Sequence, residues 1–400
     1  MGCNTYFYSG AYNTSLKREL NIDQLFSYYH EPKLVIDTIK YKHDHPEYTA
    51  KIMLDSGAFT HYQDSKKKGI ILTDQDILDY TDRYLEYLNE WGDDLFCFVG
   101  VDSVPDPENV DPTYAQKTWD NYLYMYSKLR PEIRHKLIPV FHYGEDFKWL
   151  RNFLEYTHED GSHLDYIGLA ISLEGTKKVR INWGQECMKI IADSSNPDVK
   201  THAFGVGVKS VLEHIDVYST DATSWVKRAA YGMISVDDKT VYISDVQRDA
   251  LKGNHYSERS AAFQYEVEKA IHDRGFRVDP EICKYEIDGD CAKFSTNEGN
   301  FVAKLDGTVI TVGDVTFKLD SVTEYTDGVV RDNFVGLWES SDERSLSFDG
   351  TGTVLYDNGR CLATNCYARA RFNIIDTELW MEKIRNAKVG NVAMKMDLGW

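Results

Sequence analysis

The sequence predicts an α/β protein in which a (β/α)8 barrel is followed by a small antiparallel β-rich region. Two observations carry this prediction. Through about residue 275, short apolar runs alternate with stretches of helical spacing, in about the eight pairs that such a barrel contains. Beyond that point, apolar residues alternate in period two between D-G and N-G turn signals, which mark β-hairpins. We therefore expect a barrel over residues 1–278 and a β-rich region over 279–400, formed by one unit or by two units divided near residues 326–333.

The predicted strands are, in order, TYFYSGAY, KIMLDSGAF, LFCFVGVD, KLIPVFHYG, DYIGLAISLEG, THAFGVGV, DVYSTDATSW and YGMISVDD. The predicted helices include DQDILDYTDRYLEYLNEW, TYAQKTWDNYLYMYSKL, DFKWLRNFLEYTHE and WGQECMKIIADS, and SERSAAFQYEVEKAIHDRG closes the pattern. An open doubly wound sheet would show a similar alternation. The barrel is favoured because distinctive polar residues fall at the carboxyl ends of several strands, which converge on one mouth in a barrel. These residues are Asp55, Asp102, His142, Gly168 with Glu174, and Asp221.

The composition limits the classes of function. A formal net charge of −19 argues against a nucleic-acid partner, because phosphate contacts need Lys and Arg, although local basic runs can give one face the opposite sign. The seven cysteines are odd in number and contain no C-x-x-C pair, so we expect reduced thiols and no zinc site. No apolar run approaches the roughly 18 residues of a membrane span, and the first residues do not resemble a signal peptide. A cytoplasmic protein without membrane contact is expected.

Aspartates at strand ends are the candidate chemical groups. Taken singly, Asp55, Asp102 and Asp221 are each explained as a helix cap or turn residue. Three carboxylates at three strand ends of one barrel instead suit the chemistry of a glycosidic bond. His202 and His214 are interpreted as structural histidines.

Short motifs around these residues are similar to those of a known family. MLDSGAF resembles the D-S-G-G/A-F motif of the tRNA-guanine transglycosylases, and FVGVD stands where that family carries its base-recognising Asp. IGLAISLEG is similar to the family's G-G-L segment, and HAFGVGV to its M-G-V-G segment. STDATSW is most similar to the S-x-D-S-T-S-W strand of the bacterial and phage branch that acts on DNA, the 7-deazaguanine DNA transglycosylases. The resemblance covers residues 1 to about 275 and implies a TIM-type barrel.

The resemblance implies an exchange in DNA of guanine for a 7-deazaguanine derivative, such as 7-cyano-7-deazaguanine. Asp221 would be the nucleophile that forms a covalent aspartyl-glycosyl intermediate, and Asp55 would be the acid and base for the two bases. Asp102 would accept hydrogen bonds from the donor edge of the base, and small residues after Asp55 would let the base pass close to the backbone. The implied base-binding residues are Ser56, Gly57, Phe59, Asp102, His142, Gly168, Leu169, Gly205 and Gly207. Lys177, Lys178, Arg180, Lys227 and Arg228 would hold the DNA backbone.

The sequence also departs from the family. The tRNA enzymes bind zinc after the barrel through a C-x-C-x-x-C motif and a distant His, which this sequence lacks, so we expect no metal and no cofactor. PVFHYG, which contains His142, stands where those enzymes carry a Gln, and this leaves the incoming base open. The nucleophile of the tRNA enzymes lies nearer Ser219, so the choice of Asp221 follows the DNA branch. The expected partners are DNA and the free base, together with an accessory protein that opens the duplex.

Three other functions compete with this interpretation. A tRNA substrate is disfavoured by the acidic composition and the missing zinc motif. A non-catalytic nucleic-acid-binding subunit built on the same barrel is disfavoured by the presence of all three aspartates. A barrel glycoside hydrolase would carry Glu at strand ends and several Trp along a groove, whereas Trp183 and Trp225 are the Trp residues placed near the mouth.

Overall fold

The computed structural model describes residues 3–10, 14–103, 113–171, 175–244, 254–306, 308–321, 335–341 and 344–397. The chain divides into two compact units, one made of Met1–Ser224 with Glu378–Trp400 and the other of Trp225–Thr377. We call the first the barrel unit and the second the inserted unit, because the second interrupts the first along the chain. Glu174 and the expected division near residues 326–333 lie outside the described residues.

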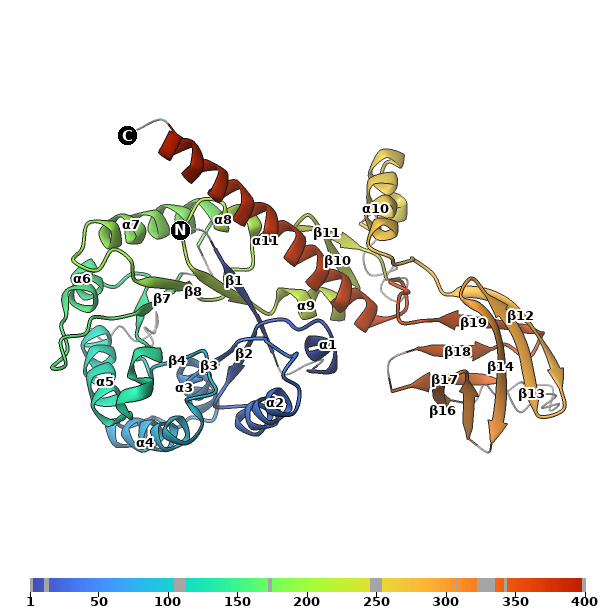
Figure 1. Ribbon diagram of the computed structural model, residues 1–400, viewed down its shortest axis with the longest axis horizontal. Coiled ribbons are helices and arrows are strands. Elements are labelled where there is room, and N and C mark those ends of the chain that lie inside the picture. Colours follow the sequence, from blue (N-terminus) through green and yellow to red (C-terminus); the bar gives the residue numbers. More distant parts are fainter. Residues whose placement is uncertain are drawn as a thin grey trace. The chain divides into compact units, whose positions relative to one another are not determined.

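Nine parallel strands form one sheet in the described part of the barrel unit, in the order β5-β4-β3-β2-β1-β9-β8-β7-β6 (Figure 1). Their bounds are β1 (Thr5–Ser9), β2 (Gln24–Ser27), β3 (Ile52–Asp55), β4 (Cys97–Val99), β5 (Leu137–Ile138), β6 (Val140–His142), β7 (Tyr166–Ala170), β8 (Lys200–Ala203) and β9 (Ser219–Ala222). Because all these strands run in the same direction, their carboxyl ends lie at one end of the sheet. Each connection between parallel neighbours must cross back to the other end.

Pro139 divides one extended run into β5 and β6. β4 pairs with β5, and β6 pairs with β7. Proline has no N–H for the ladder, but its carbonyl still accepts a hydrogen bond of 2.9 Å from the Gly168 amide. The two ends of the sheet are therefore consecutive in the chain, and the sheet curls into a nearly closed barrel. The predicted combination of an α/β barrel with a β-rich region is confirmed.

Helices in the connections surround the strands (Figure 1). They are α1 (Thr14–Glu19), α2 (Pro32–Asp44), α3 (Ala58–Lys67), α4 (Asp74–Trp91), α5 (Tyr114–Lys128), α6 (Phe147–Glu155), α7 (Lys177–Ala192) and α8 (Lys209–Leu212), with a 3-10 helix η1 (Pro131–Lys136). α4 shows why such segments are helical. Thr73 and Asp76 form a capping box at its start, and Tyr84, Leu85 and Leu88 recur at helical spacing on its buried face.

The last helix, α11 (Cys366–Asp397), begins in the inserted unit and ends in the barrel unit. Phe7 of β1 belongs to the apolar cluster that the strands enclose, so its neighbours Tyr6 and Tyr8 face outward. The Tyr8 hydroxyl donates a hydrogen bond of 2.9 Å to Glu378, and the Tyr6 ring meets Trp380 edge to face at 6.0 Å. The end of α11 thus covers the outer face of β1. The expected boundary at residues 278/279 is displaced, because residues 225–278 group with the β region and the end of the chain returns to the barrel.

The inserted unit combines a hairpin, helices and a second barrel. It contains all but the first residue of α9 (Ser224–Ala230), followed by β10 (Met233–Val236), β11 (Lys239–Tyr242), the 3-10 helix η3 (Tyr256–Glu258) and α10 (Ala261–Asp273). The barrel strands are β12 (Glu281–Asp288), β13 (Cys291–Thr296), β14 (Gly299–Asp306), β15 (Val309–Val312), β16 (Val315–Ser321), β17 (Gly336–Ser340), β18 (Ser345–Phe348) and β19 (Thr353–Asp357). They pair in chain order, and β19 pairs with β12 to close one antiparallel barrel.

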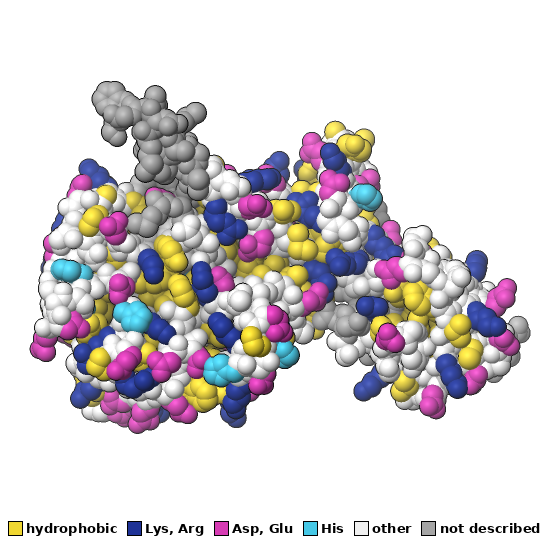
Figure 2. Space-filling model, viewed as in Figure 1, with side chains coloured by type: hydrophobic (Ala, Val, Ile, Leu, Met, Phe, Trp, Pro, Cys, Tyr) yellow, Lys and Arg dark blue, Asp and Glu magenta, His cyan; other side chains and the backbone are white. Residues whose placement is uncertain are grey.

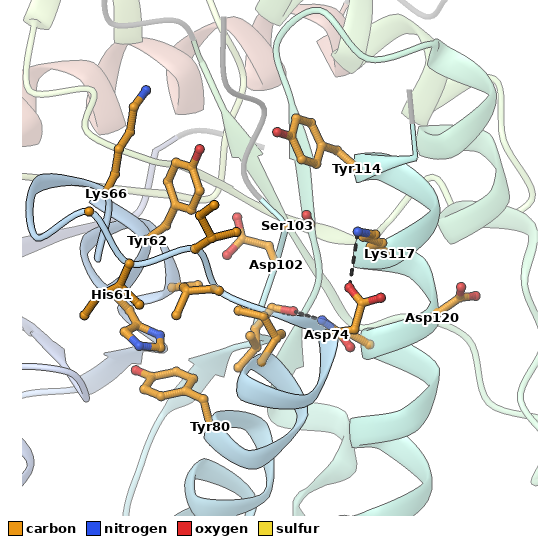
Figure 3. Close-up of a pocket in the computed structure, with 18 residues that line it drawn as sticks. His61, Tyr62, Lys66, Asp74, Tyr80, Asp102, Ser103, Tyr114, Lys117 and Asp120 are labelled. Carbon is orange, nitrogen blue, oxygen red and sulfur yellow. Dashed lines mark hydrogen bonds and ion pairs between the residues drawn. The ribbon is translucent and has the colours of Figure 1, made fainter. Parts of the chain in front are cut away.

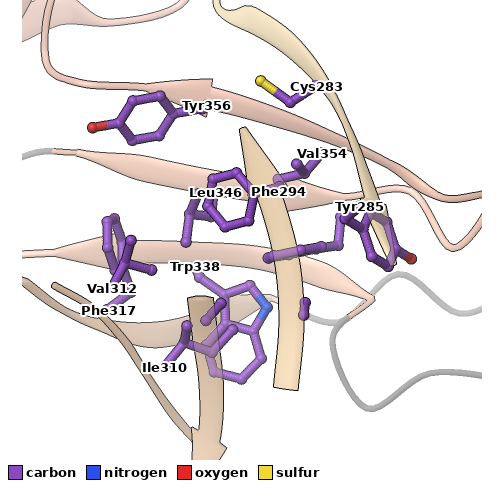
Figure 4. Close-up of a cluster of buried hydrophobic side chains, with 13 residues drawn as sticks. Cys283, Tyr285, Phe294, Ile310, Val312, Phe317, Trp338, Leu346, Val354 and Tyr356 are labelled. Carbon is purple, nitrogen blue, oxygen red and sulfur yellow. The ribbon is translucent and has the colours of Figure 1, made fainter. Parts of the chain in front are cut away.

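Apolar side chains fill the inside of this second barrel (Figure 4). Trp338, Phe317 and Phe348 are among its fully buried members. Full burial of a large apolar side chain contributes roughly 1.5–3 kcal/mol to the stability of the fold. The apolar residues that alternate along the β-rich region therefore form a stabilising core inside this barrel.

Along the described residues, none of the helices has the length and apolarity that crossing a membrane requires.

Candidate active site

Three aspartates come from three strand ends, and two of them lie close enough to shift the pKa of the third. Asp55 ends β3, Asp102 follows β4, and Asp221 lies in β9. Burial of its carboxyl group, together with the negative charges of Asp102 and Asp221, raises the pKa of Asp55 to about 7. The predicted convergence of these carboxylates at one mouth is therefore present in the structure.

Asp221 is surrounded by hydrogen-bond donors. The Ser9 hydroxyl donates to its Oδ2 at 2.6 Å, and the Gly205 amide donates to its Oδ1 at 2.8 Å. His202 Nε2 lies 3.3 Å from the same Oδ1. Burial would raise the pKa of Asp221, but the contacts with His202, Ser9 and Gly205 outweigh it and lower this pKa below its ordinary value. Asp221 is therefore held as a carboxylate, while Asp55 is poised to keep a proton.

A buried chain of polar groups continues from Asp221 into the barrel. His202 Nδ1 lies 2.7 Å from Ser219 Oγ, and this hydroxyl also meets the hydroxyl of Tyr166. Asp221, His202, Ser219 and Tyr166 thus form one continuous hydrogen-bonded network. Ser219 and Asp221 are two positions apart on one strand and share a face, but Ser219 is fully buried, whereas Asp221 is 8% exposed.

His142 is clamped between two carboxylates. Its Nε2 lies 2.7 Å from Asp102 Oδ2, and its Nδ1 lies 2.9 Å from Glu145 Oε1. Burial opposes a charge on the imidazole, but the hydrogen bonds to Asp102 and Glu145 outweigh burial and raise the pKa of His142 to about 9. At neutral pH the ring is an imidazolium that donates through both nitrogens. It therefore fixes the Oδ2 oxygen of Asp102.

Tyrosine hydroxyls hold the backbone on both sides of Asp55. Tyr80 donates to the carbonyl of Ser56, and Tyr84 donates to the carbonyl of Leu54 at 3.4 Å. Gly57 caps α3 with φ 74°, and a Cβ there would lie 2.5 Å from Tyr29 Cβ. Gly57 is thus small because the backbone conformation and Tyr29 require it, and no passing base is needed to explain it.

A cavity of about 880 Å³ adjoins Asp102 (Figure 3). Its walls come from α3, from the segment 69–72, from the first turns of α4 and α5, and from the residues that follow β4. Asp102 and Ser103 lie between Tyr62 and Tyr114 in this view. The volume is within the 300–1,000 Å³ typical of small-molecule sites.

The other expected base-binding residues differ from one another in their exposure and in their contacts. Phe59 is 56% exposed on the first turn of α3, as a stacking residue must be, whereas the Ser56 side chain is buried. A Cβ on Gly168 would lie 2.4 Å from the Phe204 ring, so the glycine lets this ring pack on β7. The Leu169 carbonyl accepts a hydrogen bond from the Phe204 amide at 3.1 Å.

The two glycines of HAFGVGV also differ in role. The Gly205 amide binds Asp221, as the hydrogen bond above shows. Gly207 is buried, and a Cβ there would lie 2.6 Å from Ala222 Cβ and 2.8 Å from the Tyr6 hydroxyl. Gly207 therefore serves packing between β9 and its neighbours. Trp183 is also buried, packed on Phe141 with ring centroids 5.7 Å apart.

The expected DNA-backbone residues separate into two groups. Lys177 and Lys178 are exposed at the start of α7, after β7, and the Arg180 guanidinium donates to the Gly175 carbonyl at 3.1 Å. Lys227 and Arg228 belong to the inserted unit. Arg228 is bonded there to Ser235 at 2.9 Å and to Asp238 at 3.2 Å, so it maintains that unit's own fold. Figure 2 shows basic and acidic side chains interspersed over the visible face.

Sequence reasoning missed several residues that contact the aspartates. His202 was interpreted as structural but contacts Asp221, whereas His214 is exposed and bonds to the Ser210 carbonyl at 2.9 Å. Ser9 ends β1 and could have been found by the strand-end rule, and Glu145 follows His142 by three positions. Tyr166 and Ser219 gave no signal, because they begin β7 and β9 and so lie at the amino ends of these strands, away from the mouth. No cluster of three or more His, Cys, Asp or Glu within the described ranges is arranged to hold a metal ion.

Comparisons with models of protein families and with curated proteins find no match to this chain. The resemblance to the transglycosylases therefore stays a prediction from motifs, and the chemistry of the site is argued from its geometry.

Proposed function

We propose that the protein is a transglycosylase that exchanges guanine in DNA for a 7-deazaguanine derivative through a covalent intermediate on Asp221. One observation carries the proposal: two carboxyl groups at one barrel mouth have pKa values displaced in opposite directions, with Asp55 raised to about 7 and Asp221 lowered. Such a pair supplies an acid and a nucleophile at the same pH.

The first half of the reaction uses both groups. An oxygen of Asp221 attacks the anomeric carbon of the nucleotide, the bond from that carbon to the base breaks, and its electron pair goes to the base nitrogen. Asp55 gives its proton to that nitrogen, so the base leaves neutral. The Ser9 and Gly205 donors orient the attacking carboxylate and make it a good leaving group in the second half.

The second half reverses these roles. The ionised Asp55 takes the proton from the ring nitrogen of the incoming base, this nitrogen attacks the anomeric carbon, and the ester bond to Asp221 breaks. Two displacements retain the configuration of the sugar. Asp102, held by His142, accepts hydrogen bonds from the donor edge of either base. The nucleotide must be unpaired or flipped out of a duplex, which costs a few kcal/mol.

The experiment is a base-exchange assay with labelled guanine and with 7-cyano-7-deazaguanine, on single-stranded DNA, duplex DNA and tRNA. We expect incorporation into DNA that is abolished in Asp221→Ala and reduced about 10²–10⁴-fold in Asp55→Ala. Asp198→Ala, on an exposed residue just before the amino end of β8 and so away from the mouth, is the matched control and should keep full activity.

A covalent DNA–protein complex on a denaturing gel should form with the wild type and be absent with Asp221→Ala. Incorporation into tRNA alone would retain the chemistry and overturn the substrate. Exchange that persists in Asp221→Ala, or no exchange in any nucleic acid, would refute the proposal.

A further inference from the structure

Two adjacent isoleucines are exposed in the connection between α3 and α4. Ile71 is 90% exposed and Ile70 is 54% exposed, and we call this pair the apolar tip. A single exposed aliphatic residue is ordinary, but here two consecutive ones lie at the mouth of the barrel and are held by ordered backbone on both sides.

Helix caps fix the backbone on either side of the apolar tip. At the end of α3, the Gly69 amide donates to the Lys66 carbonyl at 3.0 Å. The Ile70 amide donates to the Ser65 carbonyl at 2.9 Å, and with Gly69 at φ 69° these two bonds form a Schellman motif. The residue after the glycine commonly packs on an apolar residue in the last turn, but Asp64 and Ser65 occupy those positions. The capping box of α4 fixes the other side, so the apolar tip is presented to solvent.

The apolar tip lies beside the candidate site. Ile70 and Ile71 line the 880 Å³ cavity together with Asp102 (Figure 3). Under the proposed function, Asp102 meets the base of the reacting nucleotide, and that nucleotide must first be unpaired or turned out of its duplex. The apolar tip is therefore next to the place where the strands of a duplex would have to be opened.

The charges around the apolar tip favour a nucleic acid as its partner. Residues 66–68 are three consecutive lysines, and all three are exposed. The Lys67 ammonium is 3.6 Å from Asp64, but an exposed pair of this kind contributes little and can be exchanged for contact with a phosphate. On the other side, Asp74 is balanced by the Lys117 ammonium at 3.3 Å. Cations next to an aliphatic pair match a phosphate backbone next to stacked bases.

We propose that Ile71, supported by Ile70, inserts between base pairs of duplex DNA and holds open the place from which the guanine nucleotide turns into the site. Isoleucine is among the apolar side chains that enter base steps in DNA-binding proteins and partly unstack them. The inference rests on the proposed function and adds to it the means of opening a duplex, a step otherwise expected from an accessory protein. An unpaired guanine does not need this step.

Truncation of the apolar tip tests the insertion on three substrates: duplex DNA, the same duplex with the guanine in an unpaired bubble, and single-stranded DNA. We expect Ile71→Ala to lower kcat/KM for base exchange at least about tenfold on the duplex, and to leave it within about twofold of wild type on the bubble and the single strand. Ile282→Ala, the same change at an exposed isoleucine of β12, is the matched control and should leave all three values unchanged. Ile70→Ala repeats the test at the second residue of the apolar tip.

A loss of equal size on all three substrates, or full activity of both variants on the duplex, would overturn the insertion while exchange by the wild type still upholds the proposed function. Exchange by the wild type that is restricted to unpaired guanine would overturn the insertion in the same way. Absence of exchange in the wild type on every substrate would remove the proposed function and the insertion with it.

Discussion

Replacing Asp55 by Asn measures how much the ionisable carboxyl group at the mouth lowers the free energy of unfolding. Asn has the shape of the protonated acid but cannot ionise. Burial and the charges of Asp102 and Asp221 raise the folded-state pKa from 3.8 to about 7. Between these two values the folded protein holds a proton that the unfolded chain has released, so the stability of the wild type falls as pH rises through this window.

The size of the effect follows from the shift. About three pKa units at 1.36 kcal/mol each give an upper limit of about 4 kcal/mol. The carboxyl is coupled to two other carboxylates and is not wholly shielded from water, so about 2–4 kcal/mol is the expected gain for Asp55→Asn above pH 7. The gain should shrink by about 1.4 kcal/mol for each pH unit below 7 and vanish near pH 4.

The assay is urea unfolding of wild type and Asp55→Asn at pH 5, 6, 7 and 8, followed by circular dichroism. The quantity compared is the difference in free energy of unfolding between the two proteins at each pH. Asp198→Asn, a substitution of an exposed carboxylate, supplies the control for loss of one negative charge. A difference that stays constant from pH 5 to pH 8 would show that the pKa of Asp55 is not raised, and the assignment of Asp55 as the acid would fall.

Three further outcomes are expected. His202→Phe removes the donor that helps keep the pKa of Asp221 low, so the acidic limb of the pH–rate profile should move to higher pH, whereas His214→Phe should leave it unchanged. Gly168→Ala forces its Cβ against the Phe204 ring and should destabilise the protein by about 1–3 kcal/mol in urea unfolding, whereas Gly100→Ala, with 3.5 Å to its nearest neighbour, should cost less than 1 kcal/mol. Replacing residues 281–357 by a short Gly-Ser linker should leave the barrel unit folded, because β12 and β19 are paired neighbours; loss of its cooperative melt by circular dichroism would contradict this.

Much of the fold could be predicted from the sequence because its signals are local. Helical spacing in α4 and strict alternation in β12 to β19 each depend on a face that must be buried, and each can be recognised within one segment. The domain boundary could not be predicted in the same way. Tyr8 and Glu378 are 370 positions apart, and no periodicity within α11 indicates that its end packs on β1.

The candidate site could also be predicted only in part from local patterns. The sequence by itself determined that Asp55, Asp102, His142 and Asp221 follow or end strands, and a parallel barrel brings strand ends to one mouth for purely geometric reasons. The shifted pKa values of Asp55, His142 and Asp221 depend on the tertiary structure. The Ser9 hydroxyl that binds Asp221 lies 212 positions away in the chain, and the charges that raise the pKa of Asp55 come from two other strands. Ionisation depends on burial and on charges within a few ångströms, and these distances are fixed by packing between segments that share no local pattern.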